Sequence, residues 1–157
     1  MMLHVVCFGN PWQGDDGFGI HVFRRLRELR DLPRHVEVFD AGIAGLGAVG
    51  YFEVCGKAVM VDALKTGGRV GRVRRIRGDD LVPPGPELSL HAFGLAHLLT
   101  ALPILFGGRA MPEVVLIGAE IGEARRYTDE LTPPLQAAID RVIRLVCRET
   151  IGHAPGC

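Results

Sequence analysis

The chain has 157 residues, 48% of them hydrophobic, which is enough for one globular domain with its own core. Its 18 basic and 18 acidic residues cancel, so the charge does not favour a nucleic-acid or membrane-surface partner. No apolar run is long enough to span a bilayer and the N-terminus does not resemble a signal peptide, so we expect a cytoplasmic protein.

The first predicted strand leads through a glycine-rich turn into a helix. Residues 3–8 are short, apolar and rich in β-branched side chains, as in a buried strand. From Phe18 to Leu29, apolar residues recur at helical spacing opposite an arginine-rich face. The turn between them carries two adjacent carboxylates, Asp15 and Asp16. We expect one of them near the first turn of the helix, where the helix dipole favours negative charge.

Strand and helix patterns alternate along the rest of the chain. Further strands are predicted at 35–40, 57–63 and 113–121, and helices over 44–55, from 89 to 103 and from 132 onward. Residues 69–77 set apolar positions among five arginines, which predicts an edge strand with solvated arginines or a surface for an acidic or extended partner. The pattern predicts a three-layer α/β/α sandwich with a mostly parallel sheet and one antiparallel edge strand. We expect residues 1–151 to form one α/β domain and residues 152–157 a tail.

Three interpretations of the glycine-rich turn remain open. A phosphate-binding turn is disfavoured, because the glycines are in the wrong order, no lysine follows, and Asp15 and Asp16 would repel phosphate. The aspartates could simply cap the helix. The third interpretation is a metal or acid–base site, which needs partners from other strand ends.

Such partners occur where other predicted strands end. Asp40 and Asp62 each close a strand, Glu120 lies near the end of the last one, and His91 lies in the first turn of a helix. Because the carboxyl ends of parallel strands meet at one edge of a sheet, we expect these groups and Asp16 on the same rim. Two carboxylates and an imidazole suit Zn²⁺, Ni²⁺ or a similar divalent ion.

We expect two other histidines and three of the cysteines to have no part in the site. His4 and His35 begin strands, and we expect them at the surface. Cys7, Cys55 and Cys147 lie in apolar segments and form no C-x-x-C pair, which is typical of small buried side chains in a reducing compartment.

Five motifs, in order and at family-like spacing, resemble those of the hydrogenase maturation endopeptidases. They are Gly9-Asn10 with Asp15-Asp16 and Gly19, Asp40 with Gly42 and Gly45, Asp62-Ala63, Ser89 with His91, Gly94 and Leu95, and Leu131-Thr132-Pro133. The resemblance covers nearly the whole chain. One departure is Ile43, which stands where the family usually has a hydroxyl residue.

The resemblance implies an endopeptidase that removes the C-terminal extension of a [NiFe] hydrogenase large-subunit precursor after nickel insertion. It implies Asp16, Asp62 and His91 as metal ligands and Asp16, Asp40 and Asp62 as catalytic candidates. Nickel is expected to arrive with the precursor, and zinc, cadmium or another divalent ion could substitute. The alternatives are a nonenzymatic nickel-delivery chaperone for the same client and a nucleotide-binding Rossmann-like protein.

Overall fold

A computed structural model describes residues 1–81 and 90–151, without the side chains of residues 90–94 and 96. Ser89, which was predicted to begin a helix, and the predicted tail lie outside this described part. Within it, no helix combines the length and the apolar character needed to cross a membrane.

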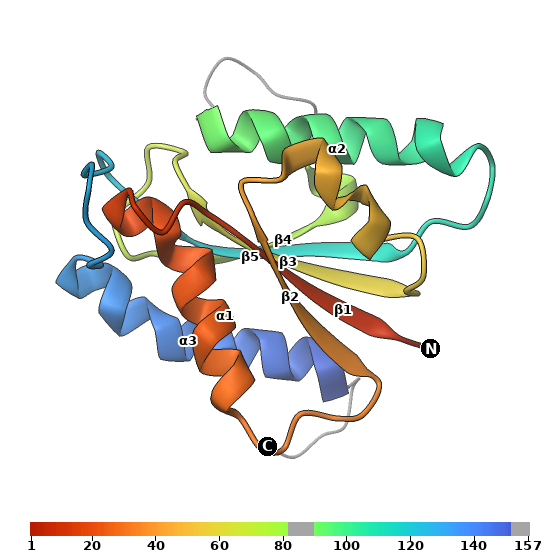
Figure 1. Ribbon diagram of the computed structural model, residues 1–157, viewed down its shortest axis with the longest axis horizontal. Coiled ribbons are helices and arrows are strands. Elements are labelled where there is room, and N and C mark those ends of the chain that lie inside the picture. Colours follow the sequence, from red (N-terminus) through yellow and green to blue (C-terminus); the bar gives the residue numbers. More distant parts are fainter. Residues whose placement is uncertain (82–89, 152–157) are drawn as a thin grey trace.

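Five strands form one sheet in the order β2-β1-β3-β5-β4 (Figure 1). Their bounds are β1 Leu3–Phe8, β2 Val36–Gly42, β3 Lys57–Leu64, β4 Val73–Arg77 and β5 Glu113–Glu120. The first three strands and β5 run parallel, whereas β4 pairs antiparallel with β5 at one edge. The predicted mostly parallel sheet and its antiparallel edge strand are therefore confirmed.

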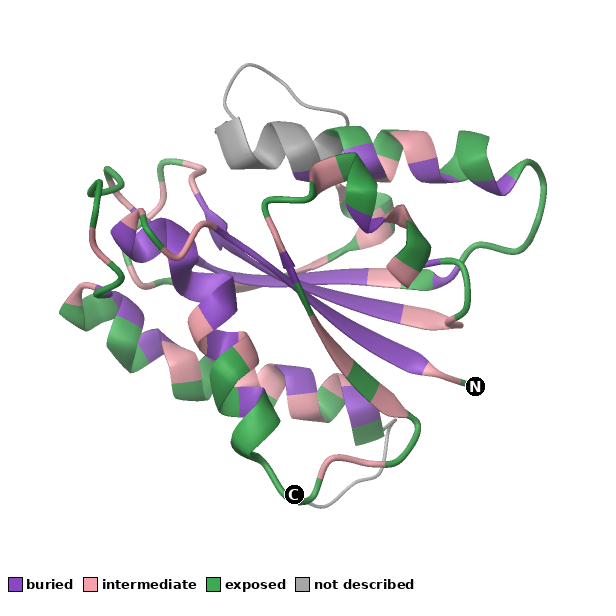
Figure 2. Ribbon diagram, in the orientation of Figure 1, coloured by how far each residue is buried: buried purple, intermediate pink, exposed green. Residues whose placement is uncertain are grey.

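Helices cover both faces of the sheet. They are the 3₁₀ helices η1 Gly14–Gly17, η2 Gly45–Tyr51 and η3 Gly78–Asp80, and the α-helices α1 Phe18–Glu28, α2 Leu90–Phe106 and α3 Pro133–Ile151. One apolar core lies between the sheet and α1 with α3, and a second lies between the sheet and α2 with η2. Figure 2 shows the central strands buried between these layers, as expected for apolar parallel strands.

Two helix predictions need correction. Residues 44–55 hold a 3₁₀ helix from Gly45 to Tyr51 rather than an α-helix, consistent with the glycines in that stretch, which weaken helical order. The helix predicted to end at Pro103 continues to Phe106. Proline removes one backbone donor, but Leu102 and Phe106 are buried in the core and keep the last turn helical.

The arginines of β4 were predicted to be solvated, but several of them form ion pairs. Glu149 of α3 accepts hydrogen bonds from Arg75, with Nη2–Oε2 at 3.2 Å, and from Lys57 of β3, at 2.7 Å. Burial alone would raise the pKa of Glu149, but the hydrogen bonds from Arg75 and Lys57 outweigh it and lower that pKa. The edge strand is thus tied to α3.

His4, which was expected at the surface, is buried. Its Nδ1 lies 2.6 Å from the carbonyl oxygen of Tyr51, and its ring packs edge-on against Phe39. The expectation failed because η2 folds over the first strand and supplies a polar partner that is distant in sequence.

Candidate active site

The carboxyl ends of β1 and β3 flank the point where the winding of the sheet reverses. From β1 the chain passes through α1 to β2 on one side, and from β2 it crosses through η2 to β3 on the other side of β1. In open α/β sheets, ligands bind in the crevice outside the strands at such a point. Asp16 follows β1 and Asp62 lies near the end of β3, so both acids border this crevice.

Close packing of α1 brings the turn that carries Asp16 against β3. A Cβ atom placed on Gly19 would lie 2.0 Å from the carbonyl oxygen of Phe8 and 2.8 Å from that of Val61. Only glycine therefore allows the helix to begin so near both strands. As a result η1, which contains Asp16, contacts β3, the strand that carries Asp62.

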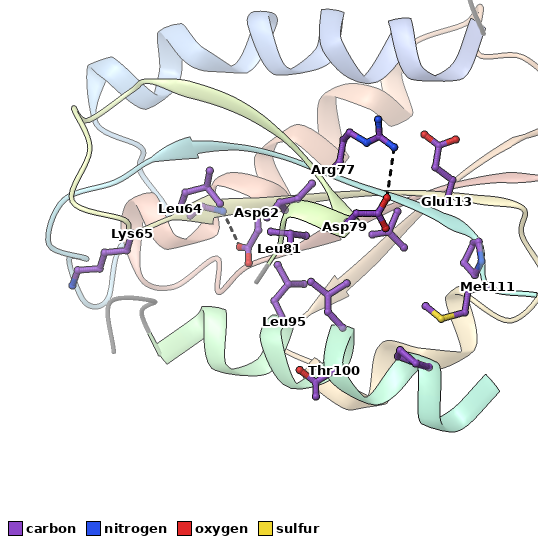
Figure 3. A pocket seen from close by; sticks show the side chains of 17 residues that line it. Asp62, Leu64, Lys65, Arg77, Asp79, Leu81, Leu95, Thr100, Met111 and Glu113 are labelled. Atoms are coloured by element: carbon purple, nitrogen blue, oxygen red, sulfur yellow. Dashed lines mark hydrogen bonds and ion pairs between the residues drawn. The ribbon is translucent and has the colours of Figure 1, made fainter. Parts of the chain in front are cut away.

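Asp16 and Asp62 are both buried, with 3% of each residue exposed. Asp62 Oδ1 accepts a hydrogen bond from the Ala63 amide at 2.8 Å. Strand alternation places Asp62 on the face of the sheet that α2 covers, together with Met60 and Leu64. Figure 3 shows its carboxylate directed into the space between β3 and α2.

The adjacent carboxylate, Asp15, has a different partner. Its two oxygens accept hydrogen bonds from the backbone amide and the hydroxyl of Thr132, each at 2.7 Å. Thr132 directly precedes α3, so Asp15 fastens the start of the last helix to the first loop. Asp15 thus has a structural role at the start of α3, and its side chain does not cap α1.

We expect Asp15→Asn to destabilise the protein by about 2 kcal/mol, because it replaces two charge-assisted hydrogen bonds in a buried place. Urea unfolding followed by circular dichroism measures this loss. Asp129→Asn is the matched control, since Asp129 is an exposed acid on the loop before α3 and should change stability by less than about 0.5 kcal/mol. Equal stability of the two variants would contradict the assigned role of Asp15.

Asp40 lies near the carboxyl end of β2, on the edge of the sheet where β1 and β3 also end. It is exposed, and its Oδ1 accepts a hydrogen bond from the Gly42 amide at 2.9 Å. Asp40 pairs in register with Cys7, and Val61 pairs with Cys7 from the other side. Burial, together with the negative charges of Asp40 and Asp62, raises the pKa of the Cys7 thiol. Strand alternation directs Asp40 to the face that α1 and α3 cover, opposite to Asp62.

His91 lies in the first turn of α2, and its side chain falls outside the described part. Among the side chains that are described, no three of the metal-binding types gather closely enough to hold an ion. Two buried carboxylates that follow neighbouring strand ends are oxygen ligands of the kind that a divalent cation takes.

Glu120, which was grouped with the rim acids, forms a separate buried cluster. Its carboxylate accepts hydrogen bonds from the backbone amide and the hydroxyl of Thr66, and Arg74 Nη1 lies 3.4 Å from its Oε1. Only 1% of Glu120 is exposed. It ties the segment that follows β3 to the end of β5.

A pocket of about 810 Å³ opens between the sheet and α2, with Asp62 in its lining (Figure 3). Its other lining residues come from β3, β5, α2 and the end of β4, and from the segments that flank these strands. Leu99 of α2 lines this pocket and is also packed partly against the second core. The sequence signal for this pocket is the composition of α2, which is apolar around much of its circumference. One stripe facing the core would not require so many apolar residues.

Comparison with known proteins gives consistent matches. Residues 20–149 match the family described as HycI, hydrogenase maturation protease. The hydrogenase expression/formation protein HupD of Bradyrhizobium diazoefficiens is 31% identical over 147 residues, which cover 92% of this chain and 75% of that protein. The hydrogenase 2 maturation protease of Escherichia coli is 28% identical, with 93% of this chain and 88% of that protein covered.

A solved structure has the same fold. The hydrogenase maturating endopeptidase HybD from E. coli superimposes with a TM-score of 0.78 and 26% identity. The superposition covers 93% of this chain and 90% of that one. The similarity therefore spans most of the sheet and of both helical layers.

Proposed function

Since the chain belongs to the hydrogenase maturation protease family, we propose that it removes the C-terminal extension from a [NiFe] hydrogenase large-subunit precursor once nickel has been inserted. The protein is an endopeptidase of hydrogenase maturation. The observation that supports nickel dependence is the pair of buried carboxylates, Asp16 and Asp62, at the crevice between β1 and β3.

Asp16 and Asp62 bind the nickel that the precursor carries, and His91 at the start of α2 is the third proposed ligand. Carboxylate and imidazole groups together suit a divalent first-row metal, and zinc or cadmium could take the same ligands. Because the ion arrives with the client, binding distinguishes a loaded precursor from an empty one. The protein then acts only after metal insertion is complete.

Asp40 is the proposed general base. It is exposed to water, and the hydrogen bond from the Gly42 amide orients its carboxylate. Asp40 takes a proton from a water molecule as the water oxygen attacks the scissile carbonyl carbon. The C–N bond then breaks, and the proton passes to the leaving amine. One water is consumed for each bond cut, and no other reactant is needed.

We expect His91→Ala to reduce cleavage of nickel-loaded precursor by about a hundredfold or more, since one of three proposed ligands is removed. Mass spectrometry of the precursor detects release of the C-terminal peptide. His97→Ala is the matched control, because His97 is an exposed histidine on the same helix. Full activity of His91→Ala would show that His91 is not a ligand at this site. Precursor that wild-type protein binds without cutting would instead support a chaperone.

A further inference from the structure

The pocket beside Asp62 runs in the direction of the strands. Figure 3 shows Asp62 and Lys65 at one end and Met111 and Glu113 at the other. In the pairing of β3 with β5, Glu113 is level with Lys57, five positions before Asp62. At roughly 3.3 Å per residue, the pocket extends about 17 Å along the sheet. That length matches an extended peptide of about five residues.

The walls of this pocket are apolar. Six aliphatic side chains from the sheet, from α2 and from the segment after η3 face it, namely Leu64, Leu81, Leu95, Leu99, Val114 and Leu116. Such a surface gains free energy when apolar side chains displace water from it.

The charged groups at the pocket rim are matched by opposite charges of the protein itself. Arg77 Nη2 lies 3.6 Å from Asp79 Oδ2, and Lys65 Nζ lies 3.5 Å from Glu123 Oε1. The third such pair joins Glu113 to Lys57 of β3, at 3.4 Å. An occupant therefore needs no net charge of its own, and a charged residue inside would be desolvated without compensation.

We propose that this pocket binds the segment of the client that is cut off, namely the first residues of the C-terminal extension, in an extended form with apolar side chains. This inference rests on the proposed function. Asp62 belongs to both the pocket and the nickel site, so the pocket begins where the client metal is held. The folded body of the client is too large for such a groove, whereas the chain beyond the scissile bond can enter it and run away from Asp62.

Filling the pocket mouth tests this proposal. Thr100 is exposed on α2 and lines the pocket, and Thr100→Trp should raise KM for nickel-loaded precursor at least about tenfold, with a smaller change in kcat. The control Ile104→Trp places the same side chain at an exposed position of α2 outside the pocket, and its KM should stay within about twofold of wild type. Should Thr100→Trp unfold by circular dichroism, Pro103→Trp replaces it, because Pro103 is also exposed and lines the pocket.

A change in the client gives an independent readout. Aspartate in place of an apolar residue among the first five of the extension should lower kcat/KM at least about tenfold with wild-type protein, and by much less with Thr100→Trp. Equal KM for the tryptophan variant and its control, or additive effects of the client and protein changes, would refute the pocket assignment. Failure of wild-type protein to cut the precursor would refute the proposed function itself.

Discussion

Asp62→Asn should abolish processing of a nickel-loaded precursor, lowering the cleavage rate by about a hundredfold or more while the protein stays folded. The amide keeps an oxygen that can accept the hydrogen bond from the Ala63 amide, so the local backbone is supported. What the variant removes is a buried negative charge at the crevice between β1 and β3. Gel mobility and mass spectrometry of the precursor measure the rate, and circular dichroism checks the fold.

Asp80→Asn serves as the matched control for this experiment. Asp80 is an exposed acid that does not line the pocket, although its neighbours in sequence do. Its loss should change the cleavage rate by less than about threefold, because a solvated surface charge contributes little. If Asp62→Asn cleaved as fast as Asp80→Asn, the charge of Asp62 would have no part in the reaction.

Gly19→Ala should destabilise the protein by about 3 kcal/mol or more, a large fraction of the total stability of a domain of this size. The added methyl group would lie 2.0 Å from the Phe8 carbonyl oxygen, so α1 would have to move away from the ends of β1 and β3. The same movement would carry Asp16 away from Asp62, and we expect cleavage to fall together with stability. Urea unfolding followed by circular dichroism measures the stability.

Gly50→Ala is the control for the backbone change itself. Gly50 lies in η2, and a methyl group there would meet no other heavy atom within 4 Å. We expect a change in stability of less than about 0.5 kcal/mol for this variant. Similar unfolding midpoints for the two alanine variants would show that close packing at Gly19 is not what holds η1 against β3.

The fold class and the neighbourhood of the site followed from local patterns. Apolar runs with helices between them predict parallel strands that are covered on both faces, and β1, β3 and β5 are such strands. Once the strands are parallel, their carboxyl ends share one edge, so acids at those ends fall near one another whatever the details of packing. The parallel order of the strands was therefore enough to predict that Asp16 and Asp62 lie at the crevice.

The sequence could not assign individual roles to these acids, because the role of each acid depends on residues that are distant along the chain. Asp15 and Asp16 are neighbours in sequence, yet Asp15 is bound to Thr132, 117 positions away. Strand alternation placed Asp40 on the opposite face from Asp62, and Thr66 and Arg74 drew Glu120 into a cluster of its own.

By itself, then, the sequence determined the layers, the parallel sheet, the edge that carries the acids and the resemblance that its motifs carry. These follow from the period of apolar residues and from short motifs, which depend on neighbours along the chain. Only the tertiary structure decided which acid holds the residue before α3, that His4 is buried, and that a pocket extends from Asp62 beneath α2. Each of these depends on contacts between segments far apart in sequence, which no local pattern encodes.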